Sequence, residues 1–435
     1  MEAATDLSQF IQETPLCDSH EHMAREEPYL ERNPDILCNL FENYLSGDLL
    51  TAGVSQSALE ALVDSSNPDV RGRFAAVEEA WKASQHTGYG EAVRLAAKHL
   101  YGMDEITVDT VESAAGRNAE WVQPGQRLHI LRDLANLDHI QTDDGRWACE
   151  PDESGPGFFF YDLSWRNFCC GTPALEELAT ETGIDPTNLS SLREAMSALF
   201  KKHASTAIAV KSQHAYVRTL SWRERSDEEA EKAFQIVRRD GESAPEEARL
   251  CLGDWGWARG CELCAEYDLP FKIHTGYYAG NDRMPVDYIK SGNMCSLLAT
   301  YLDTRFVMMH IAYPYSQELT ALAKHYRNVY IDLCWAWSID PYSSCDFVRR
   351  LIHAAPANKL FIFGGDTVGP VPAFGYAVQA RQWFTRALEG EVAEGLLTEK
   401  EALALAGKFM RDNQYDCFRV DAKRAAISES MQAAV

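Results

Sequence analysis

The sequence predicts a (β/α)8 barrel, which is a closed ring of eight parallel strands surrounded by helices. Three observations lead to this prediction: short apolar runs alternate with stretches of helical spacing, eight such runs can be counted, and metal-ligating residue types directly follow several of them. Strands that alternate with helices are typical of a parallel sheet. Eight successive units fit a closed barrel whose chemistry lies at the carboxyl ends of its strands.

The apolar runs define the predicted strands in order. The first run covers residues 14–17, directly before two histidines. The other seven runs lie at 135–140, 157–163, 206–210, 270–273, 305–309, 329–333 and 359–364. Apolar residues three and four positions apart predict helices between the later runs, at 187–203, 227–240, 244–267, 294–302, 316–326 and 343–355, with one more at 398–420.

The segment directly after the first strand, residues 24–130, follows a different pattern. It contains no convincing series of strands, and we expect it to form a helical insertion or cap beside the barrel mouth. Its aromatic residues, Trp81 and Tyr101 among them, are expected either in its core or closing over a substrate. Helical spacing recurs in three stretches, at 45–63, 70–82 and 90–101.

The length of the chain agrees with this division. A total of 435 residues is too long for one simple core and fits a barrel-sized domain with a large insertion. We expect the barrel to comprise residues 1–23 and 131–420, the insertion to comprise 24–130, and a C-terminal tail to comprise 421–435.

Composition excludes several classes of function. A net charge of −24 repels phosphate backbones and makes nucleic-acid binding unlikely to be the function, while no apolar run reaches the length of a membrane span. The 12 cysteines are scattered, and the first 30 residues lack the pattern of a secretory leader. We therefore expect reduced thiols, a cytoplasmic location and a small-molecule partner, with homo-oligomerisation left open.

Six residues that could bind metal stand at the ends of predicted strands. His20 and His22 point to one side of a strand, because strand side chains repeat with period two. Each of the six has an ordinary structural interpretation when taken alone, such as a core histidine or a helix cap. Together, in barrel order, they predict a metal site: His20, His22, Lys211, His274, His310 and Asp366.

Lys211 is the most informative of these residues. An unpaired ammonium group at the end of a strand that faces the barrel mouth would be costly. The group is tolerated if a carboxylate pairs with it, or if it reacts with carbon dioxide to form a carbamate. A carbamate is anionic and has two oxygens, so it can bridge two metal ions.

The order of these ligands resembles the amidohydrolase superfamily. Local strings resemble its "amidohydrolase 2" group, which includes the amidohydrolase half of fusions with a glutamine-synthetase-like domain. One departure follows Gly276, where we would expect Gly and Asp but find Tyr277-Tyr278-Ala279-Gly280-Asn281. The matching strings are Lys211-Ser212, Ala215-Tyr216, Arg218, His274-Thr275-Gly276, Met309-His310, Tyr313-Pro314-Tyr315, Asn328-Val329-Tyr330-Ile331-Asp332 and Gly364-Gly365-Asp366.

The resemblance implies metal-dependent hydrolysis of an amide, a related C–N bond or an ester in a small, carboxylate-bearing substrate. His20, His22 and Asp366 would bind one ion, His274 and His310 a second, and carboxylated Lys211 would bridge them. Asp366 would act as general base and then acid. Zinc is the first expectation, as one or two ions, with manganese, iron or nickel as alternatives. Candidate substrate contacts are Arg218, Tyr216, His214, Tyr313 and Trp335.

Two other functions stay open. The same superfamily contains metal-dependent decarboxylases and uronate isomerases, and the decarboxylases of this group typically use one metal without the strand-end lysine. The presence of Lys211 together with His310 therefore favours a two-metal hydrolase. The second alternative is a non-catalytic metal-binding protein, which the intact set of ligands argues against.

Overall fold

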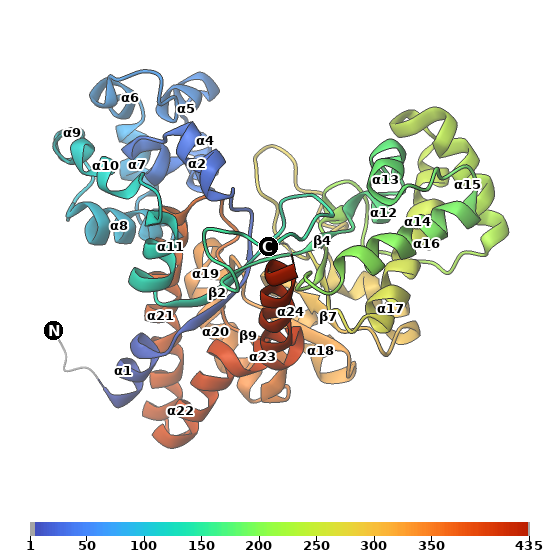
Figure 1. Ribbon diagram of the computed structural model, residues 1–435. Coiled ribbons are helices and arrows are strands. Elements are labelled where there is room, and N and C mark those ends of the chain that lie inside the picture. The colour runs from blue at the N-terminus through green and yellow to red at the C-terminus, as the bar shows by residue number, and fades with distance from the viewer. Residues whose placement is uncertain (1–4, 434–435) are drawn as a thin grey trace.

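The computed structural model describes residues 5–433 and has the architecture that the sequence predicts (Figure 1). All paired strands run parallel, in two sheets of order β1-β2-β3 and β4-β5-β6-β7-β8-β9. The strands are β1 (Leu16–Glu21), β2 (Leu137–Thr142), β3 (Phe159–Tyr161), β4 (Leu163–Ser164), β5 (Val210–Ser212), β6 (Phe271–Ile273), β7 (Phe306–Met308), β8 (Val329–Asp332) and β9 (Leu360–Phe361).

Backbone hydrogen bonds join these two sheets into one ring. Only Asp162 separates β3 from β4, and its N–H donates to the Thr142 carbonyl of β2. The N–H of Leu163, the next residue, donates to the carbonyl of Ala209, which directly precedes β5. The strands β3 and β4 therefore occupy one position in the ring, between β2 and β5. At the other seam the Ser19 N–H of β1 donates to Phe363, just beyond β9. The eight strand positions therefore close, which confirms the predicted (β/α)8 barrel with a large helical insertion.

Most helices around the ring coincide with the expected segments. In α15, Ser226 and Glu229 form a capping box, and the buried face repeats at Ala230, Ala233, Phe234 and Val237, which is the spacing of an amphipathic helix. The helices that follow β4 are α12 (Arg166–Cys170), α13 (Leu175–Thr182), α14 (Leu189–His203), α15 (Asp227–Asp240), α16 (Glu246–Glu266), α17 (Cys295–Thr300), α18 (Ser316–His325), α19 (Ala336–Ile339), α20 (Pro341–Ile352), α21 (Pro370–Ala393), α22 (Glu399–Gly407), α23 (Asn413–Phe418) and α24 (Val420–Ala433).

Helix α21 is the longest element that sequence patterning missed. Its side chains are buried on nearly every face between the barrel and the insertion, so no polar stripe marks it. The C-terminal tail is also structured, because α24 buries Lys423 and Ile427, and Arg424 donates to Asp138 of β2 at 2.7 Å. No helix among residues 5–433 is both long enough and apolar enough to cross a membrane.

The insertion between β1 and β2 is helical and forms the lobe on the left of Figure 1. Trp81 and Tyr101 are buried in the core of this lobe, where they donate hydrogen bonds to Ile106 and Asn118, so neither covers the barrel mouth. After α1 (Asp6–Glu13), which precedes the barrel, its helices are α2 (Glu26–Arg32), α3 (Ile36–Phe41), α4 (Leu45–Thr51), α5 (Gln56–Leu62), α6 (Val70–Ala75), α7 (Glu78–Ser84), α8 (Gly88–Tyr101), α9 (Val108–Ala114), α10 (Asn118–Trp121) and α11 (Gln126–Leu128), followed by a π-helical turn at His129–Leu134.

A charged pair lies inside the barrel. The Lys272 ammonium contacts both carboxylate oxygens of Asp162, at 2.8 and 2.9 Å, and also the Ser19 carbonyl at 2.8 Å. Both side chains are fully buried. Burial raises the pKa of Asp162, while the neighbouring Lys272 lowers it. Removing one partner of such a pair is costly, because the other charge then stays buried without compensation.

We predict that Lys272→Met lowers the free energy of unfolding by about 3–5 kcal/mol at pH 7. The loss should shrink as the pH falls, because the unpaired Asp162 carboxyl has a pKa raised by burial and becomes neutral by taking up a proton. Urea unfolding of Lys272→Met and of the double variant Lys272→Met/Asp162→Asn measures this. The double variant, which removes both charges, should recover most of the loss. A single variant as stable as the wild type would show that the pair is not structural.

Candidate metal centre

Three side chains at the mouth of the barrel form a nearly equilateral triangle of ligand atoms. The Nε2 atoms of His20 and His22, at the end of β1, lie 3.3 Å apart. Asp366, which follows β9, places Oδ1 3.2 Å from the first nitrogen and 3.4 Å from the second. These atoms converge because β1 and the segment after β9 are neighbours across the seam of the ring, where the Asp366 N–H donates to the His20 carbonyl.

The other three predicted ligands lie next to this triangle. His274 follows β6, His310 follows β7, and their Nδ1 and Nε2 atoms are 3.0 Å apart. The same His310 nitrogen lies 3.8 Å from the second oxygen of Asp366. Lys211 of β5 places its Nζ 3.1 Å from the His20 Nε2. The structure therefore brings together all six residues that the sequence singled out.

Backbone carbonyls on the outer side of the site fix the ring tautomers of three histidines. His22 and His310 each present Nδ1 to a carbonyl oxygen, of Asp143 at 2.8 Å and of Cys334 at 2.9 Å. His274 presents Nε2 to the Tyr277 carbonyl at 2.9 Å. A carbonyl can only accept, so these nitrogens carry the hydrogens, and the nitrogens that face the centre carry lone pairs.

This arrangement fits a divalent metal ion. Two lone pairs that face each other at 3.0 Å, as in His274 and His310, cannot form a hydrogen bond and need a shared cation. Zinc binds nitrogen and oxygen at about 2.0–2.2 Å, so two tetrahedral ligands lie about 3.3–3.5 Å apart, which matches the triangle. Burial lowers the pKa of His20, His274 and His310, that of His310 to about 4, and keeps them in the neutral form that binds metal.

The two lysines that lie on barrel strands, Lys211 on β5 and Lys272 on β6, have contrasting surroundings. Lys272 is neutralised by Asp162, as described above. Lys211 is only 1% exposed, yet within residues 5–433 no carboxylate oxygen lies within 4 Å of its Nζ. Its hydrogen-bonding partner is the imidazole of His20. The ordinary structural interpretation of Lys211 is a salt bridge. Within residues 5–433 the structure contains no carboxylate that forms one with this lysine.

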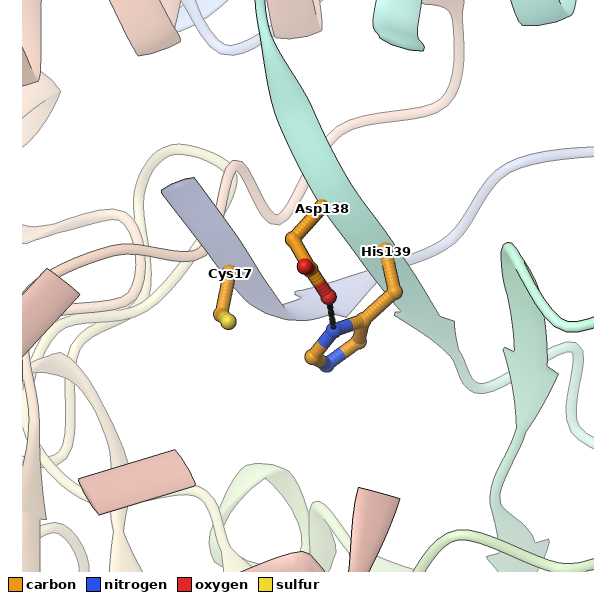
Figure 2. A group of neighbouring side chains, drawn as sticks. All are labelled: Cys17, Asp138 and His139. Carbon is orange, nitrogen blue, oxygen red and sulfur yellow. Dashed lines mark hydrogen bonds and ion pairs between the residues drawn. The ribbon is translucent and has the colours of Figure 1, made fainter. Parts of the chain in front are cut away.

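A second group of potential ligands lies near the opposite ends of β1 and β2 (Figure 2). Cys17, Asp138 and His139 are neighbours there, and the His139 Nδ1 is 2.8 Å from Asp138. The same carboxylate also accepts hydrogen bonds from Tyr415 and Arg424. Tyr415 and Arg424 already compensate the charge of the Asp138 carboxylate, and burial raises the pKa of the Cys17 thiol. These three residues therefore fit a metal ion less well than the six residues at the barrel mouth do.

The residues predicted to contact substrate do not share one environment. Tyr216 lies against His274, with ring centroids 4.8 Å apart, and lines the mouth cavity beside His22. Trp335 is buried 5.3 Å from the His310 ring. Tyr313 lies outside that cavity, where its hydroxyl is 3.4 Å from Asp340.

Arg218 and His214, two further predicted substrate contacts, do not line the mouth cavity. The Arg218 guanidinium is 6% exposed and donates to Asp254 at 2.6 Å and to the Ser221 carbonyl at 2.7 Å. His214 is fully buried against Trp257 and bonded to Ser212. Asp254 of α16 pairs with the Arg218 guanidinium, and Ser212 of β5 contacts the His214 Nδ1, while the His214 Nε2 is buried without a partner among the described residues.

The mouth cavity also contains residues that sequence reasoning missed. Its volume is about 1030 Å³, and its lining includes Arg146, Trp147 and Arg166 from the loops after β2 and β4. The insertion contributes Tyr44, whose ring lies 4.3 Å from that of Trp335. The position of Arg166 just after a strand end is the signal in the sequence that marks it.

The loop that departs from the family pattern also has a structural role. Tyr277 supplies the carbonyl that orients His274, and Tyr278 donates to Ala215. Gly276 adopts a positive φ of 78°, and a Cβ at this position would lie 2.6 Å from backbone atoms of Ala312 and Tyr313. The glycine is therefore required by the close approach of the loops after β6 and β7.

Comparisons with known proteins agree with the fold. Residues 219–403, which include β6 to β9, match the amidohydrolase family. A stretch of 97 residues, 21% of this chain, is 34% identical to Protein fluG of Emericella nidulans and covers 10% of that protein. The aligned stretch therefore spans about a tenth of the length of this relative.

Three solved structures share the fold over almost the whole chain. The glucuronate isomerase of Caulobacter crescentus superposes with a TM-score of 0.78 at 18% identity, over 96% of this chain and 94% of its own. The uronate isomerase of Thermotoga maritima superposes with a TM-score of 0.75 at 14% identity, over 95% of this chain and 97% of its own. A Lactobacillus casei protein assigned as a metal-dependent hydrolase superposes with a TM-score of 0.69 at 15% identity, over 97% of this chain and 99% of its own.

The barrel and its strand-end ligands define a (β/α)8 protein with a candidate metal centre at the mouth. The match to the amidohydrolase family covers the strands that precede His274, His310 and Asp366, which are three of the six candidate metal ligands. Residues 219–403 of the chain are similar to the amidohydrolase family.

We predict that removing divalent metal with a chelator lowers the thermal midpoint of the protein, because an ion that binds only the folded state stabilises it. His22→Ala should weaken metal binding at least about tenfold. Elemental analysis and thermal unfolding measure both effects. His129→Ala, which removes an exposed histidine paired with Asp133, is the matched control and should bind metal as the wild type does. Equal metal content in the two variants would remove His22 from the site.

Proposed function

We propose that this protein is a metal-dependent hydrolase that cleaves an amide, a related C–N bond or an ester in a small, carboxylate-bearing molecule. The observation that carries this proposal is Lys211, a buried lysine without a carboxylate partner that lies 3.1 Å from a predicted metal ligand. A carbamate on this lysine would be attracted to divalent ions that repel an ammonium group. Carboxylated Lys211 would then complete a two-metal ligand set, with zinc as the first candidate.

The bound metal would lower the pKa of a water ligand and polarise the scissile carbonyl. Asp366 is the residue in position to move the proton. Its Oδ1 faces His20 and His22, while its Oδ2 is 3.8 Å from His310 and accepts no hydrogen bond within residues 5–433. In the proposal this oxygen takes the proton of the attacking water and returns it to the leaving nitrogen or oxygen, so Asp366 acts as base and then as acid.

The cations of the mouth cavity support a substrate with a carboxylate. Arg166 is half-buried, and no carboxylate oxygen of the described chain lies within 4 Å of its guanidinium. Its polar contact is the Asn167 side chain, at 3.4 Å. Arginine binds carboxylates through two parallel hydrogen bonds, so Arg166 is suited to hold this part of the substrate. It takes the role that the sequence suggested for Arg218.

A second candidate function is non-hydrolytic chemistry, a uronate-type isomerase or a decarboxylase, on the same barrel. The observation in its favour is that the triangle of His20, His22 and Asp366 can hold one ion without Lys211. The cytoplasm is the proposed location, and the 12 cysteines are all free in the structure, which fits a reducing compartment.

Turnover on two panels separates the candidate functions. We predict that the metal-loaded protein releases amine or alcohol from N-acyl amino acids or related esters and does not isomerise uronates. Asp366→Asn should lower turnover about 10²–10⁴-fold while the fold is kept, because asparagine has nearly the same volume and tolerates the positive φ of 54° at this position. Isomerisation of a uronate without hydrolysis would favour the second candidate, and an Asn variant with full activity would remove Asp366 from the mechanism.

We predict that Lys211→Ala loses both activity and metal, and that short carboxylic acids such as acetate or propionate restore part of each. A small carboxylate can occupy the space of the carbamate and supply its two oxygens to the ions. Lys272→Ala provides the comparison, since its loss should reduce stability and should not respond to added acid. Full activity of Lys211→Ala without any acid would show that this lysine neither bridges metal nor contacts substrate.

A further inference from the structure

A second cavity lies beside the mouth, in the helical lobe at the right of Figure 1. Its volume is about 560 Å³, a size that suits a small organic molecule. The start of α12, the loop before α13, the end of α15 and the start of α16 surround it. We call it the arginine pocket, after the cations that line it: Arg166, Arg218, Arg238 and Arg249.

Three of these four arginines have no compensating charge nearby. Arg218 is neutralised by Asp254. For Arg166, Arg238 and Arg249, no carboxylate oxygen of the described chain lies within 4 Å, and the Arg249 Nε donates to a backbone carbonyl. Three glutamates, Glu176, Glu242 and Glu246, also line the pocket, but none forms an ion pair with these guanidinium groups. The pocket therefore presents three arginines that form no ion pair with the described chain and are available to pair with an anion.

Part of the remaining wall of the pocket is apolar. Leu175 and Leu250 line it, and so does Val217, a large apolar side chain that is 47% exposed. Apolar walls with a few convergent polar groups are typical of sites for small organic ligands. A ligand that uses both features carries an anionic group and an apolar body.

We propose that the arginine pocket binds a small organic carboxylate with an apolar body, through Arg238 and Arg249. Arg166 and Asn167 form a wall that this pocket shares with the mouth cavity. Two kinds of molecule can supply this carboxylate. One is an elongated substrate whose reactive bond lies at the metal centre and whose far end enters the arginine pocket. The other is a separate molecule that contacts Arg166 from the side of the arginine pocket.

Titration calorimetry of the metal-loaded protein with phenylacetate tests the proposal. The wild type should bind phenylacetate and should not bind the neutral 2-phenylethanol. Arg238→Gln/Arg249→Gln should weaken binding about tenfold or more, because each change removes a charge-assisted hydrogen bond. Both side chains are at least partly exposed, so the double variant should fold.

Two controls make the result specific to this pocket. Arg239→Gln removes the same charge from the next position of α15, where Arg239 is paired with Asp240 outside the pocket. Arg146→Gln removes a cation that lines the mouth cavity alone. Both should bind phenylacetate as the wild type does. The proposal is overturned if the wild type shows no saturable binding, if the double variant binds equally well, or if Arg146→Gln alone abolishes binding.

Kinetics with a hydrolysed substrate identify the source of the carboxylate. If phenylacetate raises KM and leaves kcat unchanged, the substrate itself extends into the arginine pocket. If phenylacetate changes kcat, the pocket binds a separate molecule. Because the calorimetry measures binding and not turnover, its outcome is independent of whether the protein proves to be a hydrolase.

Discussion

The architecture of the site depends on lone pairs that face one another inside the barrel mouth. His274 and His310 bring two unprotonated nitrogens within 3.0 Å, and the Nε2 atoms of His20 and His22 lie 3.3 Å apart. The outer nitrogens of three of these rings are held by backbone carbonyls, so the rings cannot turn to relieve the contact without losing a buried hydrogen bond. A shared cation resolves this conflict, and the closed ring of strands is what keeps the ligands in place for it.

Charge compensation differs among the cations that lie in and around the barrel mouth. Lys272 and Arg218 are buried and fully paired, with Asp162 and Asp254. Lys211 and Arg166 have no such partner, although both lie at strand ends around the mouth. Burying a charge without a partner is costly, so an uncompensated group at the mouth is a candidate to be completed by a group from outside the protein chain. For Lys211 we propose a carbamate and metal, and for Arg166 a carboxylate of the substrate.

The strand ends could be predicted from the sequence because their signal is local. Each apolar run is followed at once by its polar residue, and barrel topology then requires those residues to meet. The roles of Arg218 and His214 could not be predicted in this way. Whether an arginine pairs with Asp254, 36 positions later on α16, depends on tertiary packing that no local pattern encodes. Helix α21 was missed for a related reason, since a helix buried on nearly all sides has no polar stripe.

The lobes around the barrel have a different role from the barrel itself. The strand ends supply the candidate metal ligands, whereas lining residues of the mouth cavity come from segments between strands, Tyr44 from the insertion and Arg166 from α12, and Trp335 from the loop after β8 packs against Tyr44. Trp335 adopts a left-handed conformation, with a φ of 63°, and so places its indole between His310 and Tyr44. Strain of this kind is costly for a bulky residue and is kept where the position of the side chain matters. The ligand set therefore limits the chemistry to what a metal centre can do, while the substrate must be selected by residues that lie outside the strands.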